Sequence, residues 1–160
     1  MIKPFAFDKA QEIFDFIEKK GFNILITKVV QLSYEDAASF YFEHMGKPFF
    51  HDMVTNMSSG PIIVAVLEKE NAVEDFRAIL GATDPLKAEE GTIRKLFGKS
   101  KSDNSVHGSD SDTSSDREIK FFFYLDGFWS RLFIEKLPLM WSFFYWERIN
   151  YLYNSICLLN

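Results

Sequence analysis

The sequence predicts one α+β domain, in which a β-sheet is covered by helices on one face. Three observations support this fold class. The local patterns follow the order helix, strand, helix, helix, strand, helix, long loop, strand, which is typical of α+β domains. The chain has 160 residues, a length at which a single hydrophobic core forms. No internal repeat is visible that would point to a repeat array.

The first helix is expected over residues 8–20. Apolar side chains recur at helical spacing within residues 10–17, Asp8 can cap the start, and Gly21 suits the position after the end. Residues 22–32 are rich in β-branched side chains and partly alternating, which predicts the first strand.

Two helices are expected next. Ser33 and Asp36 have the spacing of a capping box, so the second helix is predicted to begin there and to reach about Met45. A shorter helix is expected between Pro48 and Gly60.

The remaining segments predict two strands separated by a helix and a loop. Residues 61–67 are a short apolar run, which predicts a buried strand, and residues 71–81 have a helical pattern that Gly81 can end. Residues 82–117 lack sustained periodicity, and loops of this length inside a compact domain are often functional. Residues 118–124 (EIKFFFY) predict a final strand.

Composition and charge argue against several classes of function. The chain is 47% hydrophobic and 26% charged, as in ordinary globular proteins. Its net charge of −5 argues against a nucleic-acid partner, because such binders are basic. The longest apolar stretch near the end is about half of the ~20 residues that span a membrane, so no membrane partner is expected. Cys157, the single cysteine, favours a reducing compartment, and we expect a soluble, cytoplasmic protein.

Residues 125–160 differ in character from the rest of the chain. They contain all three tryptophans and many Phe, Leu and Tyr residues without a clean amphipathic period. We therefore expect one domain over residues 1–124 and an aromatic-rich tail of unknown role after it. Such a composition would follow from AT-rich DNA translated out of frame or through a lost stop codon. A hydrophobic partner-binding or membrane-surface tail is the alternative.

Among the three histidines, His107 has the most suggestive surroundings. It lies in the polar stretch of residues 104–111 (NSVHGSDS) within the long loop. On spacing alone, a solvated loop histidine is the simpler interpretation. A neutral imidazole is nevertheless a competent nucleophile, which nearby hydroxyl and carboxylate groups can orient. His44 and His51 lack the partners that complete a metal site, so no protein metal ligand is predicted.

Residues 91–100 (GTIRKLFGKS) do not form a phosphate-binding P-loop. Six residues separate the two glycines, whereas that motif has four, and no strand is predicted before them. Arg77 and Arg94 are better candidates for phosphate, because a guanidinium can donate two hydrogen bonds to one phosphate group. A surface salt bridge is the alternative for each of them.

Taken together, these motifs resemble the nucleoside diphosphate kinase family, bacterial type, over residues 1 to about 123. Residues 104–111 contain the N-x-x-H-G-S-D-S signature of that family's active site. The other matches follow in the family's order: Lys3-Pro4, Lys20-Gly21-Phe22, Tyr41, Lys47-Pro48-Phe49-Phe50, Ser59-Gly60-Pro61, Gly81-Ala82-Thr83-Asp84-Pro85, Gly91-Thr92-Ile93-Arg94 and Arg117-Glu118-Ile119.

The resemblance implies a ferredoxin-like antiparallel sheet and a ping-pong phosphoryl transfer. A nucleoside triphosphate such as ATP would give its γ-phosphate to a histidine, and a second nucleoside diphosphate would collect it. Mg²⁺ would bridge the nucleotide phosphates as the cofactor. A homo-oligomer, either a tetramer or a hexamer, is also implied.

The same resemblance implies a role for each matched residue. His107 would be the nucleophile, and Glu118 would hydrogen-bond its other ring nitrogen and fix the tautomer. Lys3 would contribute to catalysis as well as to phosphate binding, Tyr41 would lie beside the nucleophile, and Phe49 would stack on the base. The remaining expected contacts to phosphates and sugar are Arg77, Thr83, Arg94 and Asn104.

The chain also departs from the family pattern. The family's first strand runs for several residues before its Lys-Pro, whereas Lys3 is the third residue here, so a truncated first strand is expected. Phe5 and Leu96 stand where the family has acidic residues. Loss of a central strand would expose two neighbouring strand edges. The alternative hypothesis is therefore a catalytically impaired nucleotide-binding or oligomeric relic from a degraded or mispredicted gene.

Overall fold

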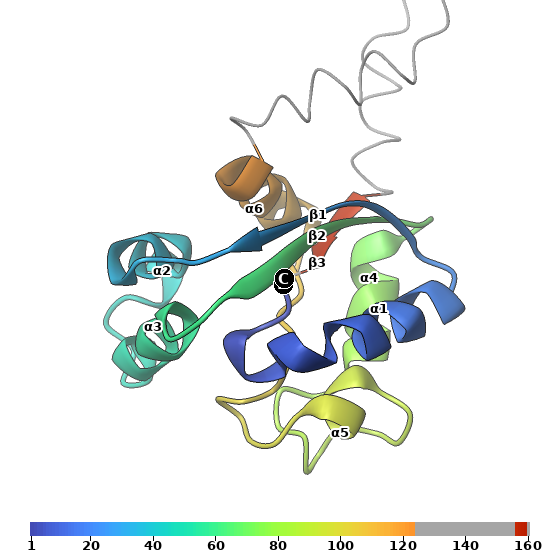
Figure 1. Ribbon diagram of the computed structural model, residues 1–160, viewed down its shortest axis with the longest axis horizontal. Helices are drawn as coiled ribbons and strands as arrows, with labels where there is room; N and C mark the ends of the chain where they lie inside the picture. Colours follow the sequence, from blue (N-terminus) through green and yellow to red (C-terminus); the bar gives the residue numbers. More distant parts are fainter. Residues whose placement is uncertain (124–155, 160) are drawn as a thin grey trace, which may run out of the picture.

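A three-stranded antiparallel sheet organises the fold (Figure 1). The computed structural model describes residues 1–123 and the backbone of residues 156–159. The strands are β1 (Asn23–Val30), β2 (Ile62–Glu68) and β3 (Ile156–Leu159), with β2 between the other two. The predicted α+β class is confirmed.

Helices lie before β1, between β1 and β2, and after β2. Those before β2 are η1 (Pro4–Lys9), α1 (Ala10–Lys19), α2 (Tyr34–Phe40), η2 (Phe42–His44) and α3 (Phe50–Ser58). Those after β2 are α4 (Ala72–Leu80), α5 (Ile93–Phe97) and α6 (Asp112–Phe123). The predicted capping box at the start of α2 is confirmed, because Ser33 Oγ accepts from the backbone N–H of Asp36 at 3.0 Å and the carboxylate of Asp36 accepts from that of Ser33 at 3.3 Å.

The strand predicted over residues 118–124 is wrong, because residues up to Phe123 belong to α6. Ser111 and Ser114 hold its first turn, where the backbone N–H of each donates to the hydroxyl oxygen of the other at 3.0 and 3.2 Å. Ile119, Phe122 and Phe123 are buried at helical spacing. The run of three phenylalanines concealed this period, since Phe121 is an aromatic residue on the outer side and 42% exposed.

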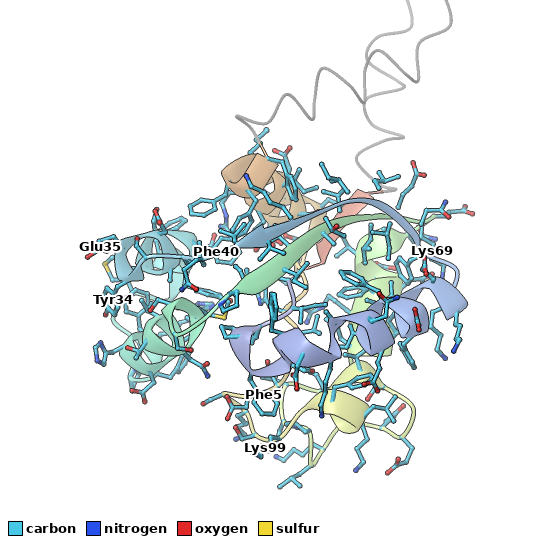
Figure 2. All side chains as sticks on the ribbon, in the orientation of Figure 1. Phe5, Tyr34, Glu35, Phe40, Lys69 and Lys99 are labelled. Carbon is cyan, nitrogen blue, oxygen red and sulfur yellow. The ribbon has the colours of Figure 1, made fainter. Side chains whose placement is uncertain are left out.

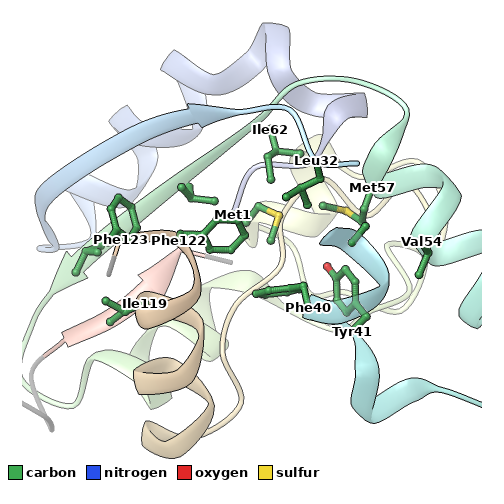
Figure 3. Packing of buried hydrophobic residues seen from close by; sticks show 13 residues of the cluster. Met1, Leu32, Phe40, Tyr41, Val54, Met57, Ile62, Ile119, Phe122 and Phe123 are labelled. Carbon is green, nitrogen blue, oxygen red and sulfur yellow. The ribbon is translucent and has the colours of Figure 1, made fainter. Parts of the chain in front are cut away.

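Side chains of β2 alternate between two hydrophobic clusters, so helices cover both faces of the sheet. Val64 and Val66 belong to a cluster with residues of α2, α3 and α6, shown in Figure 3. Ala65 and Leu67 belong to a second cluster with residues of α1, α4 and α5. The expected single layer of helices corresponds to α1 and α4. On the opposite side of the sheet lies α6, and α2 and α3 lie beyond one end of β1 and β2 and contribute side chains to the first cluster (Figure 1).

Phe5, one of the departures noted in the sequence, has a packing role. It lies at the start of η1 and packs against the second hydrophobic cluster. The ammonium of Lys99 lies 5.4 Å from the centre of its ring (Figure 2), which is a cation–π contact between η1 and the loop after α5.

Two separate parts of the chain pair with the second edge of β2. Ile2 forms antiparallel bridges with Ile63 and with Val106. Further along β2, β3 pairs antiparallel from Leu159, which lies opposite Ala65, to Ile156, which lies opposite Glu68. Because both partners run antiparallel to β2 along one edge, β3 continues the line of Ile2 in the sheet.

The expected truncated first strand therefore corresponds to the bridges of Ile2, with β3 in line with it. β3 also lies beside α4 and α6. The last residues of the predicted tail thus pair with the domain sheet. Residues 125–155 and 160 of that tail, and Tyr124 at the end of the predicted domain, lie outside the described residues.

The register of β3 predicts a specific disulfide. The Cα of Cys157 is the partner of the Cα of Leu67, and such partners lie about 4.5–5.5 Å apart, within reach of a disulfide. We expect Leu67→Cys to form an intramolecular disulfide with Cys157 under mild oxidation, measured by intact mass and by a Tm above that of the same variant after reduction. Val66→Cys, whose partner is Leu158, should stay reduced. Equal crosslinking of both variants, or crosslinking between molecules, would contradict this register.

Within the part of the chain that the structure describes, no helix is long and apolar enough to cross a membrane.

Candidate functional site

The loop that carries His107 is tied to the first residues of the chain. The backbone N–H of His107 donates to the carbonyl oxygen of Met1 at 3.0 Å, and the amino group of Met1 donates to the carbonyl oxygen of His107 at 2.9 Å. The backbone N–H of Lys3 donates to the carbonyl oxygen of Ser105 at 2.9 Å. Ser105 has a φ of 67°, which is uncommon for serine, so tertiary contacts hold this turn. His107 is thereby fixed beside Lys3.

The other side of the loop packs closely against α4. A Cβ at Gly108 would lie 2.6 Å from Leu80 Cδ1 and 2.9 Å from Phe76 Cδ1, so this approach requires glycine. The guanidinium of Arg94 donates to the carbonyl oxygen of Val106 at 3.2 and 3.3 Å and to that of Gly81 at 2.9 Å. Arg94 thus joins the His107 loop to the end of α4.

A buried carboxylate from α6 faces the ring of His107. Glu118 is 4% exposed, and its Oε1 lies 3.7 Å from His107 Nε2. Its Oε2 accepts a hydrogen bond from Ser109 Oγ at 2.6 Å. Since Nε2 faces the carboxylate, Nδ1 is the ring nitrogen left for a reaction partner.

Aromatic side chains surround the same imidazole and help to exclude water. The rings of Phe40 and Tyr41 lie edge-on to it, with centroids 5.9 and 5.6 Å away, and Figure 3 shows these two side chains together at the end of α2. Burial lowers the pKa of His107 below its ordinary 6.5, although Glu118 opposes that shift. The imidazole is therefore neutral near pH 7 and keeps a lone pair on one nitrogen. Burial, followed by the charge of Glu118, raises the pKa of Tyr41, which remains an uncharged phenol.

Three cations, Lys3, Arg77 and Arg94, gather beside the histidine. Burial, and then the charge of Arg94, lowers the pKa of Lys3 to about 8, although Asp103 opposes this shift. Burial, and then the charge of Arg77, lowers the pKa of Arg94 to about 10. Because these like charges repel one another, a polyanion such as a chain of phosphates would bind favourably among them.

Buried polar atoms that lack a partner also concentrate here. Within the described residues, the buried side-chain atoms without a hydrogen-bond partner are Tyr41 Oη, Asn104 Oδ1, His107 Nε2 and Asp116 Oδ1. Of these, His107 Nε2 faces Glu118 Oε1 at 3.7 Å. Folded proteins satisfy nearly all buried polar atoms, so Tyr41 Oη and Asn104 Oδ1 point to a ligand at this site. Asn104 Nδ2 donates to the carbonyl oxygen of Thr83 at 3.4 Å, which brings the loop after α4 to the same place.

Phe49 lies further from His107, on the other side of the rings of Tyr41 and His44. The ring of His44 stacks on Tyr41 at 6.2 Å and meets Phe49 edge-on at 5.9 Å. Phe49 is 51% exposed, and Lys47 Nζ lies 5.8 Å from the centre of its ring. An exposed aromatic face beside a cation suits the stacking of a flat, electron-rich ligand.

The residues predicted from the sequence thus fall into two groups. The structure brings one group together around the histidine: Lys3, Tyr41, Arg77, Arg94, Asn104, His107 and Glu118. Thr83 and Phe49 connect to that group through Asn104 and His44. The hydrogen bond from Ser109 to Glu118 and the hydrogen bonds between Met1 and His107 were not predicted from the sequence. The HGSDS motif contained the signal for Ser109, whereas nothing local indicates Met1.

Protein side chains alone do not form a metal centre in this region. No group of three His, Cys, Asp or Glu side chains within the described residues could hold a metal ion.

Comparison with known proteins gives a consistent family. The model of the nucleoside diphosphate kinase family matches residues 1–127. The structure of the Aquifex aeolicus nucleoside diphosphate kinase is similar, with 41% identity, a TM-score of 0.72, and coverage of 76% of this chain and 90% of that one.

Two further solved structures are similar. The Encephalitozoon cuniculi nucleoside diphosphate kinase, in an apo form, has 33% identity and a TM-score of 0.74, covering 92% of this chain and 95% of that one. The halophilic nucleoside diphosphate kinase from Halobacterium salinarum, in complex with CDP, has 35% identity and a TM-score of 0.72. That match covers 76% of this chain and 83% of the other.

Proposed function

This chain belongs to the nucleoside diphosphate kinase family, and from that premise we propose that His107 carries the phosphoryl group between two nucleotides. The enzyme class is a phosphotransferase with the ferredoxin-like fold of that family. One observation supports the proposed mechanism above the others: a histidine whose pKa is lowered by burial faces a buried carboxylate in a site that also contains three cations.

In the first half-reaction, His107 Nδ1 attacks the γ-phosphorus of a nucleoside triphosphate such as ATP. The new N–P bond forms as the bond from that phosphorus to the β,γ-bridging oxygen breaks, and the nucleoside diphosphate leaves. The Nε2 proton stays on the ring, which gains positive charge. The carboxylate of Glu118, 3.7 Å from Nε2, stabilises that charge and orients the ring.

The second half-reaction reverses these steps with another nucleotide. A terminal phosphate oxygen of a nucleoside diphosphate attacks the phosphorus of phosphohistidine, and the N–P bond breaks. Neutral His107 is regenerated and a nucleoside triphosphate is released. Lys3 and Arg94 neutralise charge on the transferring group, which supplies most of the catalysis in reactions of this kind.

Binding of the nucleotide involves both parts of the site. We propose that Arg77, Thr83, Arg94 and Asn104 contact phosphates and sugar, and that Phe49 stacks on the base. Stacking uses the π-face that every base has, which suits little base preference. Mg²⁺, held by the nucleotide phosphates, would neutralise part of their charge.

We also propose a homo-oligomer, a tetramer or a hexamer, and a cytoplasmic location. Light scattering of the purified chain tests the assembly.

Brief incubation of the protein with ATP and Mg²⁺, followed by intact-mass measurement, tests the proposed function. We expect the gain of one acid-labile phosphoryl group, which is lost again on addition of GDP as GTP forms. A folded protein that gains no phosphoryl group would overturn the proposal and favour the alternative of a nucleotide-binding relic.

The pH dependence of phosphorylation follows from two shifted groups. His107 reacts when it is neutral, and its lowered pKa places the acid limb of kcat/KM below pH 6.5. Lys3 attracts phosphate when it is protonated, and its pKa of about 8 places an alkaline limb near that pH. We expect a bell-shaped pH profile in quenched single-turnover reactions. The profile of Lys3→Met should lack the alkaline limb and keep the acid limb. A wild-type rate that stays constant up to pH 9.5 would contradict the role of Lys3.

A further inference from the structure

Arg117 belongs to a sequence motif that the proposed mechanism leaves without a role. Its guanidinium makes contacts in two directions. Nη2 lies 3.5 Å from Glu118 Oε1, and Nη1 pairs with Glu43 Oε1 in η2. The guanidinium carbon lies 5.5 Å from the centre of the Phe42 ring, also in η2. Arg117 thus connects α6 to the turn that follows Tyr41.

The carboxylate that Arg117 reaches is the one that faces the nucleophile. Glu118 is buried, and a buried carboxylate is costly unless opposite charge and hydrogen bonds compensate it. Oε2 is satisfied by the hydroxyl of Ser109. Oε1 is shared, because His107 Nε2 lies 3.7 Å from it and Arg117 Nη2 lies 3.5 Å from it.

We propose that Arg117 is a positioning residue: by sharing Oε1 of Glu118 with His107, it sets the orientation and the effective charge of the carboxylate that supports the nucleophile. This inference rests on the proposed phosphotransfer function. Glu43 and Phe42 fix the guanidinium so that its second nitrogen reaches Glu118. A guanidinium can serve two carboxylates at once in a fixed geometry, which an ammonium cannot reproduce.

The charge of Arg117 has a measurable consequence for His107. The charged groups that influence the imidazole are Glu118, the amino group of Met1 and Lys3. Glu118 in turn faces Arg117 and the phenol of Tyr41. Without the cation, Glu118 would act on His107 with less of its charge neutralised. The protonated imidazole would then be favoured, so the pKa of His107 would rise.

Titration of the histidine ring protons by NMR tests this inference independently of catalysis. The chain has three histidines, and His107→Gln assigns the signal of His107. In Arg117→Met we expect the pKa of His107 to rise by roughly half a unit, a small shift because Arg117 is about one third exposed. The signal of His51, which is exposed, should not move. Arg117→Lys should restore the titration because it restores the charge.

Rapid-quench measurement of phosphohistidine formation supplies the second readout. Arg117→Met should be slower by about tenfold at pH 7, and its acid limb should move to higher pH, because the ring is less well oriented and protonates earlier. Arg117→Lys should keep the acid limb of the wild-type pH profile. Its phosphohistidine should still form more slowly than in the wild type, since an ammonium cannot hold Glu43 and Glu118 at once in a fixed geometry. Lys120→Met removes a cation from the same helix that pairs with Asp116 instead, and it should match the wild type.

The outcomes separate this inference from the proposed function. If the wild type is never phosphorylated, the proposed function fails, whereas the NMR titration still tests the coupling of Arg117 to His107. If the wild type is phosphorylated but Arg117→Met has an unchanged His107 titration, the inference is wrong. Should Arg117→Met fail to fold, Arg117→Gln removes the charge while it keeps a donor, and the same shift is expected.

Discussion

Replacement of His107 by Gln is expected to abolish phosphoenzyme formation and to lower nucleoside diphosphate kinase activity by at least about 10⁴-fold. The amide nitrogen of Gln takes the place of ring Nε2, which faces Glu118 at 3.7 Å, and can donate to that carboxylate, so the buried carboxylate keeps a partner. The variant has no nucleophilic nitrogen in the position of Nδ1. Intact mass after incubation with ATP and Mg²⁺, together with coupled-assay rates, measures both effects.

A matched substitution separates loss of the nucleophile from loss of the fold. His51 is exposed and its Nδ1 lies 2.9 Å from the hydroxyl of Tyr34, far along the chain from the catalytic loop. His51→Gln should be phosphorylated at the wild-type rate. If His107→Gln still gains an acid-labile phosphoryl group, another residue is the carrier and the assignment of His107 is wrong.

Replacement of Lys3 by Met is expected to lower kcat/KM by about 10²–10³-fold, the usual effect of removing one preorganised group that stabilises transferring charge. The same change should not destabilise the protein. The pKa of Lys3 is lowered to about 8, chiefly by burial, so folding disfavours its charged form. The free energy of unfolding therefore increases as pH rises from about 8 towards 10.5. Below pH 8, the buried charge of Lys3 lowers the free energy of unfolding.

Urea unfolding at pH 7 measures the second part of this prediction. Met has a similar length and no charge, so Lys3→Met should be as stable as the wild type or more stable, by on the order of 1 kcal/mol or more. Lys19→Met provides a control, because Lys19 is exposed on α1 and should change neither quantity. A large loss of stability in Lys3→Met would show that the side chain is structural, and the loss of activity would then say nothing about phosphate.

The family could be predicted from the sequence because its motifs are residue types at fixed short spacings. Residues 104–111 and the motifs around Lys3 and Arg94 identified the family that the comparisons support. Most helices and both early strands were also predicted, since their apolar periods are local properties. The capping box at Ser33 was confirmed for the same reason.

The segment that follows the His107 loop shows where local pattern is insufficient. Residues 118–123 contain consecutive aromatic residues, which suit a strand as well as a helix. The structure forms a helix because Ile119, Phe122 and Phe123 meet one core while Phe121 stays outside. That choice matters for function, since it places Glu118 beside His107 and Arg117 beside Glu43.

What the sequence by itself determined about this protein is its family, because the family's motifs are residue types at fixed short spacings; the nucleophile and the phosphate contacts stay predictions from those motifs. What only the tertiary structure decided are contacts between distant segments. These are the pairing of β3 with β2, the bonds between Met1 and His107, and the sharing of one carboxylate oxygen by His107 and Arg117. Such contacts depend on how the sheet and its helices pack, and no local period encodes them.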